Sequence, residues 1–289
     1  MSNARADRVK DVARLAGRPA RLRQNRFLAE GPQTVREALR LHVERRSGSA
    51  VGVVDDLYIT AATLDRHPDL GMLAETAGLE CRIATDEVLA AMASTVTPQG
   101  VLAVCREIDI PLEKVLAGNP RLVAVLVEVR DPGNAGTILR AADSAGADAV
   151  IVTRSSVDLY NPKTVRSTVG SLFHLPVVLG MDASEVFESL AAAGIAVLAA
   201  DGYGAHDLHD LQDESARRRF GASPSSAGPR LENPTAWLFG NEAQGLPAAA
   251  LEAADYRVAV PLYGQAESLN VGTAATVCLY ASARSQRKI

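Results

Sequence analysis

The sequence predicts an α/β protein whose C-terminal part is a parallel sheet with helices on both faces, preceded by a smaller α/β domain. Strand-like and helix-like segments alternate in the second half, as in Ala149–Val152, Ala183–Ala193 and Ile195–Ala200. Such alternation is typical of parallel sheets. The chain has 289 residues, of which 47% are hydrophobic, and this is enough for two modest cores.

The first 25 residues predict a basic helical arm, with Val9, Val12, Ala13 and Ala16 on its apolar face. Residues 1–26 contain eight basic and two acidic side chains, although the whole chain has a net charge of −4. A basic arm on an acidic body is what binding to phosphate groups would need. A solvated, arginine-rich surface helix explains the same pattern equally well.

Residues 26–106 predict a small α/β domain. Pro32 is expected to open a helix, and Thr85 or Asp86 to cap another. His42 and His67 have no neighbours at ligand spacing, so we expect ordinary surface histidines. The expected elements are a strand at Phe27–Gly31, a helix at Pro32–Leu41, strands at Ala50–Val54 and Tyr58–Thr60, a helix at Asp69–Ala77, a strand at Glu80–Ala84, a helix after Thr85 or Asp86 and a strand at Gly100–Cys105.

Residues 107–120 are rich in proline and glycine and predict a linker, with a helical turn between. The apolar run Leu122–Val129 is typical of a central parallel strand. Residues 205–234 are too polar and too rich in glycine and proline for a core element, so we expect an inserted surface loop. Its Arg217-Arg-Arg219 triplet is interpreted as solvated rather than as an RNA contact. The remaining expected elements of residues 121–234 are helices at Thr137–Ala145 and Lys163–Val169 and a strand at Pro176–Leu179.

The stretch from Trp237 to Ala281 predicts a strand, a polar loop, a second strand, another polar loop and a helix. The strands are Ala236–Phe239 and Val258–Leu262, and Ser268 occupies the expected N-cap of the helix. Free backbone groups at strand ends and helix starts can hold a ligand. Glycine and asparagine at strand ends are also common in any α/β domain, so this stretch alone leaves both interpretations open.

A second polar segment follows the strand Leu122–Val129. Gly133 and Gly136 bracket Asn134 where a helix begins, and Arg140 lies in the first turns of that helix. A guanidinium near open backbone amides can fix a phosphate group. A dinucleotide-binding fingerprint is excluded, because the glycines do not have its spacing and Gly202-Tyr-Gly204 lacks the third glycine.

Composition excludes several classes of protein. No apolar run reaches the ~20 residues of a membrane span, and no apolar stretch follows the cationic N-terminus as in a secretory signal. Cys81, Cys105 and Cys278 are widely spaced among apolar neighbours. This favours buried free thiols over a disulfide or a metal site. We therefore expect a cytoplasmic protein that binds neither membrane nor metal.

Three motifs follow one another along the chain: Asn134 with Arg140, Phe239-Gly-Asn-Glu-Ala-Gln-Gly245, and Val260-Pro-Leu262 with Ser268-Leu-Asn-Val271. In this order they resemble the motifs of the SpoU (TrmH-type) RNA ribose 2′-O-methyltransferases. The N-terminal part is similar to the ribosomal-protein-like substrate-binding domain of that family, through Arg26-Phe-Leu-Ala-Glu-Gly31 and Thr97-Pro-Gln-Gly-Val101.

The resemblance implies a fold and a cofactor. The family has a parallel-sheet domain closed by a deep trefoil knot (SPOUT-type), and S-adenosylmethionine binds in that knot, mostly through backbone groups. The family acts as a homodimer with the active site near the subunit interface, and a helix such as Leu269–Ala283 suits that packing. Residues implied to line or approach the cofactor are Leu238, Gly240, Val260, Leu262, Ser268 and Leu269.

The resemblance also assigns roles in catalysis. Arg140 matches the catalytic arginine, and we expect it to stabilise charge on the ribose oxygen, because an arginine with a pKa above ~12 is a poor general base. Asn134 is expected to orient the arginine or the substrate, while Ser268 and Asn270 hold the ribose and the loop. Glu242 is expected to fix Arg140 or its own loop, with a purely structural role as the alternative.

The substrate implied is RNA, with 23S ribosomal RNA favoured because tRNA-specific relatives often lack the N-terminal domain. On this reading residues 26–106 are the RNA substrate-binding domain and residues 121–289 the methyltransferase domain. The alternatives are a tRNA 2′-O-methyltransferase and a non-catalytic RNA-binding or ribosome assembly factor. Candidates to extend a positive site around Arg140 are Arg130, Arg154, Lys163 and Arg166. Solvated charges on a helix explain Lys163 and Arg166 at least as well.

Overall fold

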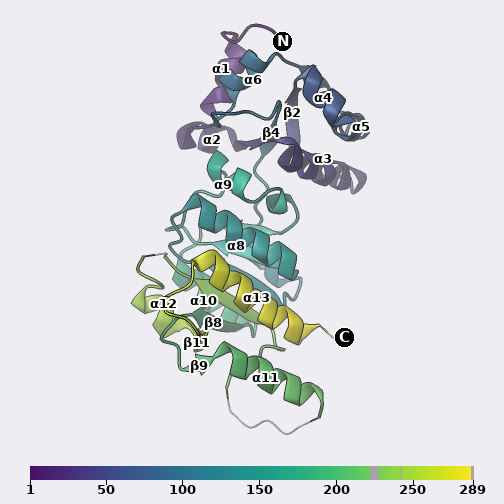
Figure 1. The fold of residues 1–289 in the computed structure, drawn as a ribbon. Helices are drawn as coiled ribbons and strands as arrows, with labels where there is room; N and C mark the ends of the chain where they lie inside the picture. The colour runs from purple at the N-terminus through teal and green to yellow at the C-terminus, as the bar shows by residue number, and fades with distance from the viewer. Residues whose placement is uncertain (222–227, 242, 288–289) are drawn as a thin grey trace. The chain divides into compact units, whose positions relative to one another are not determined.

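The computed structural model describes residues 1–221, 228–241 and 243–287 (Figure 1). The chain forms two compact units. One unit contains Met1–Ile108 together with Asp158–His174, and the other contains Asp109–Val157 and Leu175–Ile289. The segment Asp158–His174 therefore belongs to the N-terminal unit, although the sequence placed it inside the second domain.

The N-terminal unit is built on a four-stranded sheet with the order β1-β4-β2-β3. Strand β4 is antiparallel to β1 and β2, while β2 and β3 are parallel. The strands are β1 (Arg26–Glu30), β2 (Val54–Ile59), β3 (Cys81–Ile83) and β4 (Val101–Arg106). The helices are α1 (Asp7–Arg14), α2 (Arg18–Gln24), α3 (Pro32–Ser47), α4 (Ala61–Arg66), α5 (Pro68–Thr76), α6 (Asp86–Met92) and α9 (Pro162–Ser167), with a 3₁₀ turn η1 (Ser171–Phe173).

A single strand, β2, replaces the two strands expected at Ala50–Val54 and Tyr58–Thr60. Asp55 and Asp56, which separate the two expected strands, lie inside β2, with a register irregularity between Val54 and Asp56. Their charges are compensated, since Asp55 pairs with Arg106 at 2.7 Å and Asp56 pairs with arginines as well. Strand pairing with β4 thus overrides the unfavourable local composition.

The first 25 residues are not a free arm. They form α1 and α2, separated around Gly17, and Val9, Val12 and Leu15 are buried in a core shared with Tyr58 and other residues of the sheet. The apolar face identified in the sequence therefore packs onto the unit instead of lying in solvent. Most of the basic side chains remain on the outer surface of these helices.

Arg21 is the exception among these basic side chains. Its side chain is only 3% exposed, and its Nη1 donates to the carbonyls of Leu15 and Ala16 at 2.9 and 2.7 Å. Its Nη2 lies 2.6 Å from Asp158 Oδ2. This arginine ties the two N-terminal helices to the later segment, so it is a structural group rather than part of a phosphate-binding surface.

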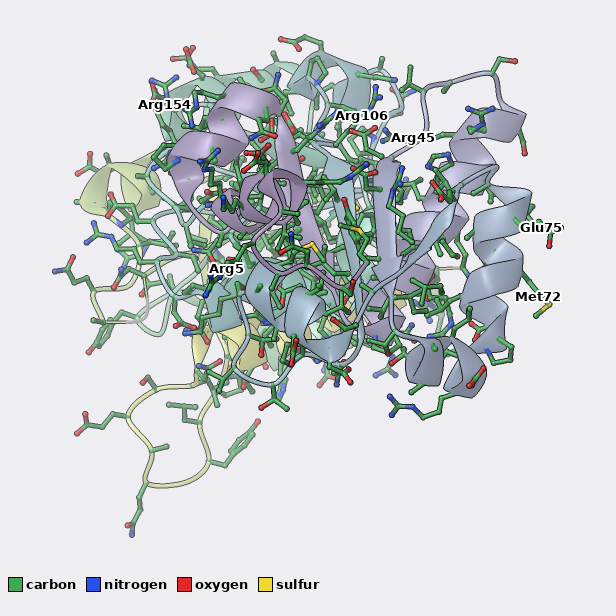
Figure 2. All side chains as sticks on the ribbon, turned by 90° about the horizontal axis from the view of Figure 1, so that it is seen from above. Arg5, Arg45, Met72, Glu75, Arg106 and Arg154 are labelled. Carbon is green, nitrogen blue, oxygen red and sulfur yellow. The ribbon has the colours of Figure 1, made fainter. Side chains whose placement is uncertain are left out.

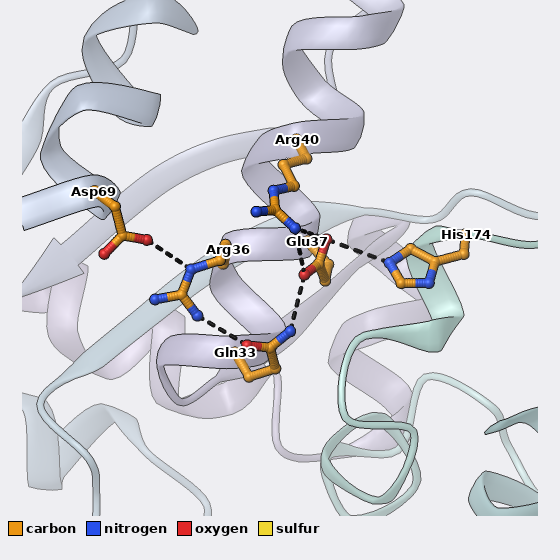
Figure 3. Close-up of polar contacts among 6 residues, drawn as sticks. All are labelled: Gln33, Arg36, Glu37, Arg40, Asp69 and His174. Atoms are coloured by element: carbon orange, nitrogen blue, oxygen red, sulfur yellow. Dashed lines mark hydrogen bonds and ion pairs between the residues drawn. The ribbon is translucent and has the colours of Figure 1, made fainter. Parts of the chain in front are cut away.

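The segment Asp158–His174 is anchored to the unit by aromatic stacking and polar contacts. The ring of Tyr160 stacks on Phe27 with centroids 4.6 Å apart, and its hydroxyl accepts a hydrogen bond from the Ile108 amide. Figure 3 shows a second anchor, where Glu37 of α3 accepts from Gln33 and Arg40 and pairs with His174. Glu37 is 5% exposed, so these partners satisfy a buried carboxylate.

His42 is buried, which corrects the expectation of a surface histidine. It is 4% exposed, and its Nδ1 accepts a hydrogen bond from the Val54 amide at 3.0 Å. Burial lowers the pKa of its imidazole, because desolvation disfavours the charged form.

The outer face of the unit carries ordinary solvated side chains, and Met72 and Glu75 project outward from α5 (Figure 2).

The second unit contains a seven-stranded sheet with the order β7-β6-β5-β10-β8-β11-β9, and every pairing is parallel. The parallel α/β fold expected from the sequence is confirmed. The strands are β5 (Leu122–Leu126), β6 (Ala149–Val152), β7 (Val177–Leu179), β8 (Ala196–Ala200), β9 (His206–Asp207), β10 (Thr235–Phe239) and β11 (Tyr256–Ala259). The helices are α7 (Leu112–Leu116), α8 (Pro132–Ala145), α10 (Ala183–Ala192), α11 (Leu208–Arg219), α12 (Ala248–Ala253) and α13 (Val271–Gln286).

Two parts of this unit differ from expectation. Within the expected linker, α7 buries Leu112 and Val115 in the core of the sheet. Within the expected loop 205–234, α11 buries Leu208 and Leu211 and packs against α13. Because α11 has only a narrow apolar stripe on an otherwise charged surface, its hydrophobic periodicity was too weak to predict a helix from the sequence. Residues 222–227 of the expected loop lie outside the described residues.

The arginine triplet at the end of α11 makes contacts within the unit. Arg217 pairs with Glu214 at 2.9 Å, and Arg218 pairs with Glu232 at 2.6 Å. Arg219 donates to the carbonyl of Arg284 near the end of α13. Arg218 and Arg219 thus connect α11 to its neighbours, while the ion pair of Arg217 lies within α11 itself. Arg217 and Arg219 remain exposed to solvent.

Candidate functional site

The polar motifs meet where strands β5, β10 and β11 end and helices α8 and α13 begin. Strands β5 and β10 are neighbours, with Leu126 opposite Phe239, and the Val127 amide donates to the Phe239 carbonyl at 2.9 Å. Strand β11 lies beyond β8 in the same parallel sheet. Carboxyl ends of parallel strands share one edge of a sheet, and this is where ligands bind in such folds.

The N-termini of α8 and α13 are joined directly. Asn270 Nδ2 donates to Asn134 Oδ1 at 2.9 Å, which links two residues 136 positions apart in the chain. Each helix start is also capped, since Asp131 accepts from the Asn134 amide at 2.8 Å and Asn270 Oδ1 accepts from the Gly272 amide at 2.9 Å. The structure therefore brings together two of the predicted site residues and fixes both by capping.

The cap of α13 is Asn270 and not Ser268, so the sequence placed the helix start two residues early. Ser268 is exposed and precedes the helix. Both residue types are good caps, and the bond to Asn134 decides between them.

The two helices approach closely at Gly272. A Cβ atom at this position would lie 2.6 Å from Cγ2 of Thr137 in α8, which is closer than real side chains allow. Further along the same pair, the Tyr280 hydroxyl donates to the Ser144 carbonyl at 3.3 Å. The small residue at the start of α13 therefore permits the contact that holds Asn134 and Asn270 together.

The loop after β10 is tightly wound around Asn241. Its backbone exchanges two hydrogen bonds with Gly245 at 2.8 and 2.9 Å, and its Nδ2 donates to the carbonyl of Glu128 at 3.2 Å. Glu128 has a φ of 57°, a left-handed conformation that is uncommon for this residue type and often found at functional sites. Asn241 thus connects the second motif to the end of β5.

Asn241 was not predicted from the sequence as a site residue, although it lies within the second motif. The available signal was an asparagine directly after a buried strand, a residue type that can bond its own loop. Glu242, the neighbour that was named instead, lies outside the described residues. Gly240 is buried, and a Cβ there would lie 2.5 Å from the Gly245 carbonyl group, so only glycine fits this turn.

Arg140 is exposed on α8. None of the hydrogen bonds or ion pairs among the described residues involves its guanidinium. Arg140 lies about two turns after Asn134 on the same helix, so the sequence placed it too near the helix start. Of the other arginines expected around it, Arg130 pairs with Glu128 and Arg154 with Asp182 at 3.1 Å each. Lys163 and Arg166 belong to the N-terminal unit.

The residues predicted to seat a cofactor come from the end of β10 and from the stretch between β11 and α13. Leu238 is buried in the core of the sheet, so only its backbone can serve a ligand. Val260 and Leu269 are half-buried, while Leu262 is 40% exposed. From Leu262 to Leu269 no backbone amide donates to another described residue. These open donors fit a ligand that is held mainly by backbone groups.

Strand β8 adds a polar pair to the same edge. Arg257 Nε donates to Asp201 Oδ2 at 2.7 Å, and the Asp201 amide donates to the Val258 carbonyl. Nearby, a Cβ at Gly204 would lie 2.6 Å from the backbone of Arg257. These contacts fix the end of β8 against β11.

Comparison with known proteins decides the family. The model of the SpoU rRNA Methylase family matches residues 121–280, which is more than half of the chain and includes all three motifs. This chain belongs to the SpoU rRNA methylase family. A second model, the MRM3-like substrate binding domain, matches residues 6–103.

Named relatives of this SpoU family member match over almost its whole length. The Bacillus subtilis (strain 168) protein named 23S rRNA (guanosine(2553)-2′-O)-methyltransferase RlmP is 36% identical, with 97% of each chain covered. A crystal structure of an RNA 2′-O ribose methyltransferase aligns with a TM-score of 0.76 and 30% identity, covering 99% of this chain and 98% of the other. The SpoU methyltransferase AviRb from Streptomyces viridochromogenes, solved in complex with the cofactor AdoMet, aligns with a TM-score of 0.74 and 31% identity, covering 96% of this chain and 98% of that one.

The described residues of this SpoU chain offer neither a metal-binding cluster nor a membrane-spanning helix. No cluster of three or more histidine, cysteine, aspartate or glutamate side chains suited to a metal ion occurs in the described parts of the chain. Among the same residues, no helix is both long and apolar enough to cross a lipid bilayer. The three cysteines are unpaired, and burial raises the pKa of the Cys105 and Cys278 thiols.

Proposed function

We propose that this protein transfers a methyl group from S-adenosylmethionine to a ribose 2′-hydroxyl of 23S ribosomal RNA. Membership of the SpoU family and the names of its full-length relatives support this activity. The structural observation that carries it is the direct bond between Asn134 and Asn270. It joins the first and third motifs at one edge of the sheet. Arg140 lies on the same helix as Asn134, and its guanidinium has no partner among the described residues.

The cofactor supplies the electrophilic methyl group when it is bound. The protein must then orient the ribose oxygen and stabilise the negative charge that develops on it. Arg140 is suited to this because its guanidinium stays protonated and is available to an oxyanion or a phosphate. The 2′-hydroxyl proton passes more readily to an RNA phosphate than to this arginine.

We assign the polar side chains of the three motifs to holding the reacting groups in place. Asn134 and Asn270 form a rigid pair, and we assign them to positioning the substrate and the loop before α13. Ser268, which is exposed two residues earlier, is assigned to the ribose. Glu242 is assigned to fixing Arg140 or the loop around Asn241.

The cofactor seat is assigned to the backbone at Leu238, Gly240, Val260, Leu262 and Leu269, with Ser268 beside it. The open amides between Leu262 and Leu269 support a ligand held by backbone groups. We assign the deep trefoil knot of the family to the same region. It is supported by the strand order, in which β10 inserts between β5 and β8 while β11 lies outside β8.

We assign a homodimeric assembly with the active site near the subunit interface. The face of α13 carries Tyr280, which is 49% exposed, and an exposed aromatic residue on a helix of small residues suits a partner surface. The N-terminal unit is assigned to RNA binding, in keeping with the substrate-binding model that matches it. The free thiols are consistent with a cytoplasmic location.

The test is transfer of labelled methyl groups from S-adenosylmethionine to separate 23S rRNA, 16S rRNA and tRNA, with the Arg140→Ala variant in parallel. We expect label in the ribose of 23S rRNA and its loss in the variant. Label in tRNA instead of 23S rRNA would show that tRNA is the substrate. Absence of label from all naked RNAs and assembling subunits would favour a non-catalytic RNA-binding or assembly factor.

A further inference from the structure

The loop Leu262–Leu269 carries much of the proposed cofactor seat but has few polar contacts of its own. Residues 262–268 are exposed, and no backbone amide of this loop donates to another described residue. Among the described residues, one hydrogen bond joins the loop to another element, and it links Tyr263 with His209 of α11. This bond is therefore the polar constraint on where the loop lies.

Two exposed aromatic rings make this contact. His209 Nδ1 and the Tyr263 hydroxyl oxygen lie 2.8 Å apart, and the rings stack with their centroids 5.9 Å apart and their planes at 25°. Tyr263 is 83% exposed, and His209 is exposed as well. Burial in a core does not hold the two rings together, so the hydrogen bond and the stacking fix their geometry.

His209 is carried by a rigid element. Asp207 caps α11 by accepting from the His209 amide at 2.7 Å, and Asp207 lies opposite Ala259 in the pairing of β9 with β11. Beyond these two partners the chain reaches His209 on one side and Tyr263 on the other, so strand register brings the rings to the same edge of the sheet. Helix α11 also packs against α13 (Figure 1). The imidazole is thus anchored to the sheet, whereas the tyrosine belongs to the loop.

We infer that His209 is a positioning residue that holds the loop Leu262–Leu269 in the conformation that binds S-adenosylmethionine, acting through the Tyr263 hydroxyl. The inference rests on the proposed function, because that function makes the loop a cofactor seat. A ligand held by backbone groups binds more tightly when those groups are already in place, since ordering a loop on binding costs affinity. Helix α11, part of a segment expected only as a surface loop, thereby braces the cofactor seat.

The experiment measures the Kd of S-adenosylmethionine by titration calorimetry on the full-length protein. His209→Ala and Tyr263→Phe should each raise this Kd by about three- to tenfold, which is what one net hydrogen bond is worth. The double variant should bind no more weakly than either single variant, because both changes remove the same bond. His209→Asn keeps an amide that can donate to the phenol or accept from it, and it should restore most of the affinity.

Two further readouts separate positioning from a general loss of structure. The KM for S-adenosylmethionine should rise with the Kd while kcat stays within about twofold, as for binding that is the same before and during transfer. In the cofactor-free protein, endoproteinase Glu-C should cleave after the exposed Glu267 faster in His209→Ala than in the wild type. The matched control is Asp213→Ala, a change at another exposed residue of α11, which should behave like the wild type in every assay.

The outcomes distinguish this inference from the proposed function. An unchanged Kd in His209→Ala, or losses that add in the double variant, would overturn the inference. Weaker RNA binding with an unchanged Kd would also overturn it, because the two rings would then belong to an RNA-stacking surface. Faster cleavage in His209→Ala, together with a wild type that binds no S-adenosylmethionine, would refute the proposed function and leave His209 as the residue that positions the loop.

Discussion

The contact between α8 and α13 makes Gly272 the most informative position to change. Replacing this glycine by alanine in an open helix would raise stability by up to about 1 kcal/mol, because alanine has the higher helix propensity. Here the new Cβ would lie 2.6 Å from Cγ2 and 3.0 Å from Cβ of Thr137. The threonine or the whole helix must move by several tenths of an ångström. Overpacking of this kind costs about 1–3 kcal/mol, so Gly272→Ala should be destabilising.

Urea unfolding followed by circular dichroism measures this change in the free energy of unfolding. Thr137→Ser is the matched partner, because it deletes Cγ2 and keeps the hydroxyl that donates to the Gly133 carbonyl at 2.9 Å. The double variant should recover most of the loss. The rate of methyl transfer should also fall in Gly272→Ala and recover in the double variant. Moving the helix starts apart breaks the bond between Asn134 and Asn270. A stabilised Gly272→Ala variant, or a double variant with no recovery, would refute the close approach.

Three other perturbations test separate parts of the structure. Asn134→Ala should lower kcat for methyl transfer at least tenfold while leaving the Kd for S-adenosylmethionine within twofold. In a double-mutant cycle, adding Asn270→Ala should reduce kcat little further. Additive losses in kcat would show that the two residues act independently. Trp237→Phe should lower the free energy of unfolding by about 1–3 kcal/mol. The buried Trp237 Nε1 donates to Ser282 Oγ at 2.9 Å, and the variant removes this hydrogen bond from the buried hydroxyl. An unchanged urea midpoint would contradict this. Burial lowers the pKa of His42 below its unfolded value of 6.5, so its contribution to stability is complete above pH 6.5 and declines as the pH falls below that value. The melting temperature of the wild type should therefore drop more between pH 6.5 and 5 than that of His42→Gln. Parallel curves for the two proteins would exclude this histidine as the cause.

Local signals in the sequence were sufficient for most elements of the sheet in the second unit. Strand β6 occupies Ala149–Val152 as predicted, and α10 ends one residue before its predicted end at Ala193. These elements have long apolar runs or clear caps, so local preference and tertiary packing agree. In the N-terminal unit the same holds for α6, where Thr85 accepts from the Val88 amide as a cap should.

The elements that sequence reasoning missed depend on contacts between distant residues. Helix α11 is charged on most of its surface, and its burial follows from packing against α13 rather than from its composition. Asn270 outcompetes Ser268 as a cap because Asn134 lies beside it. Asn241 is important because its side chain reaches the Glu128 carbonyl. No local pattern encodes pairings of this kind, so they could be found only in the folded chain.

The membership of Asp158–His174 in the N-terminal unit has a consequence for how such proteins can be divided. The chain passes from one unit to the other three times, after Ile108, Val157 and His174. A fragment that ends at Ile108 would lose both aromatic partners of Phe27 and the arginine that pairs with Glu30. The N-terminal unit is thus not a detachable module. A chimaera that exchanges this unit between relatives has to carry a matching inner segment, taken from within the methyltransferase sequence itself.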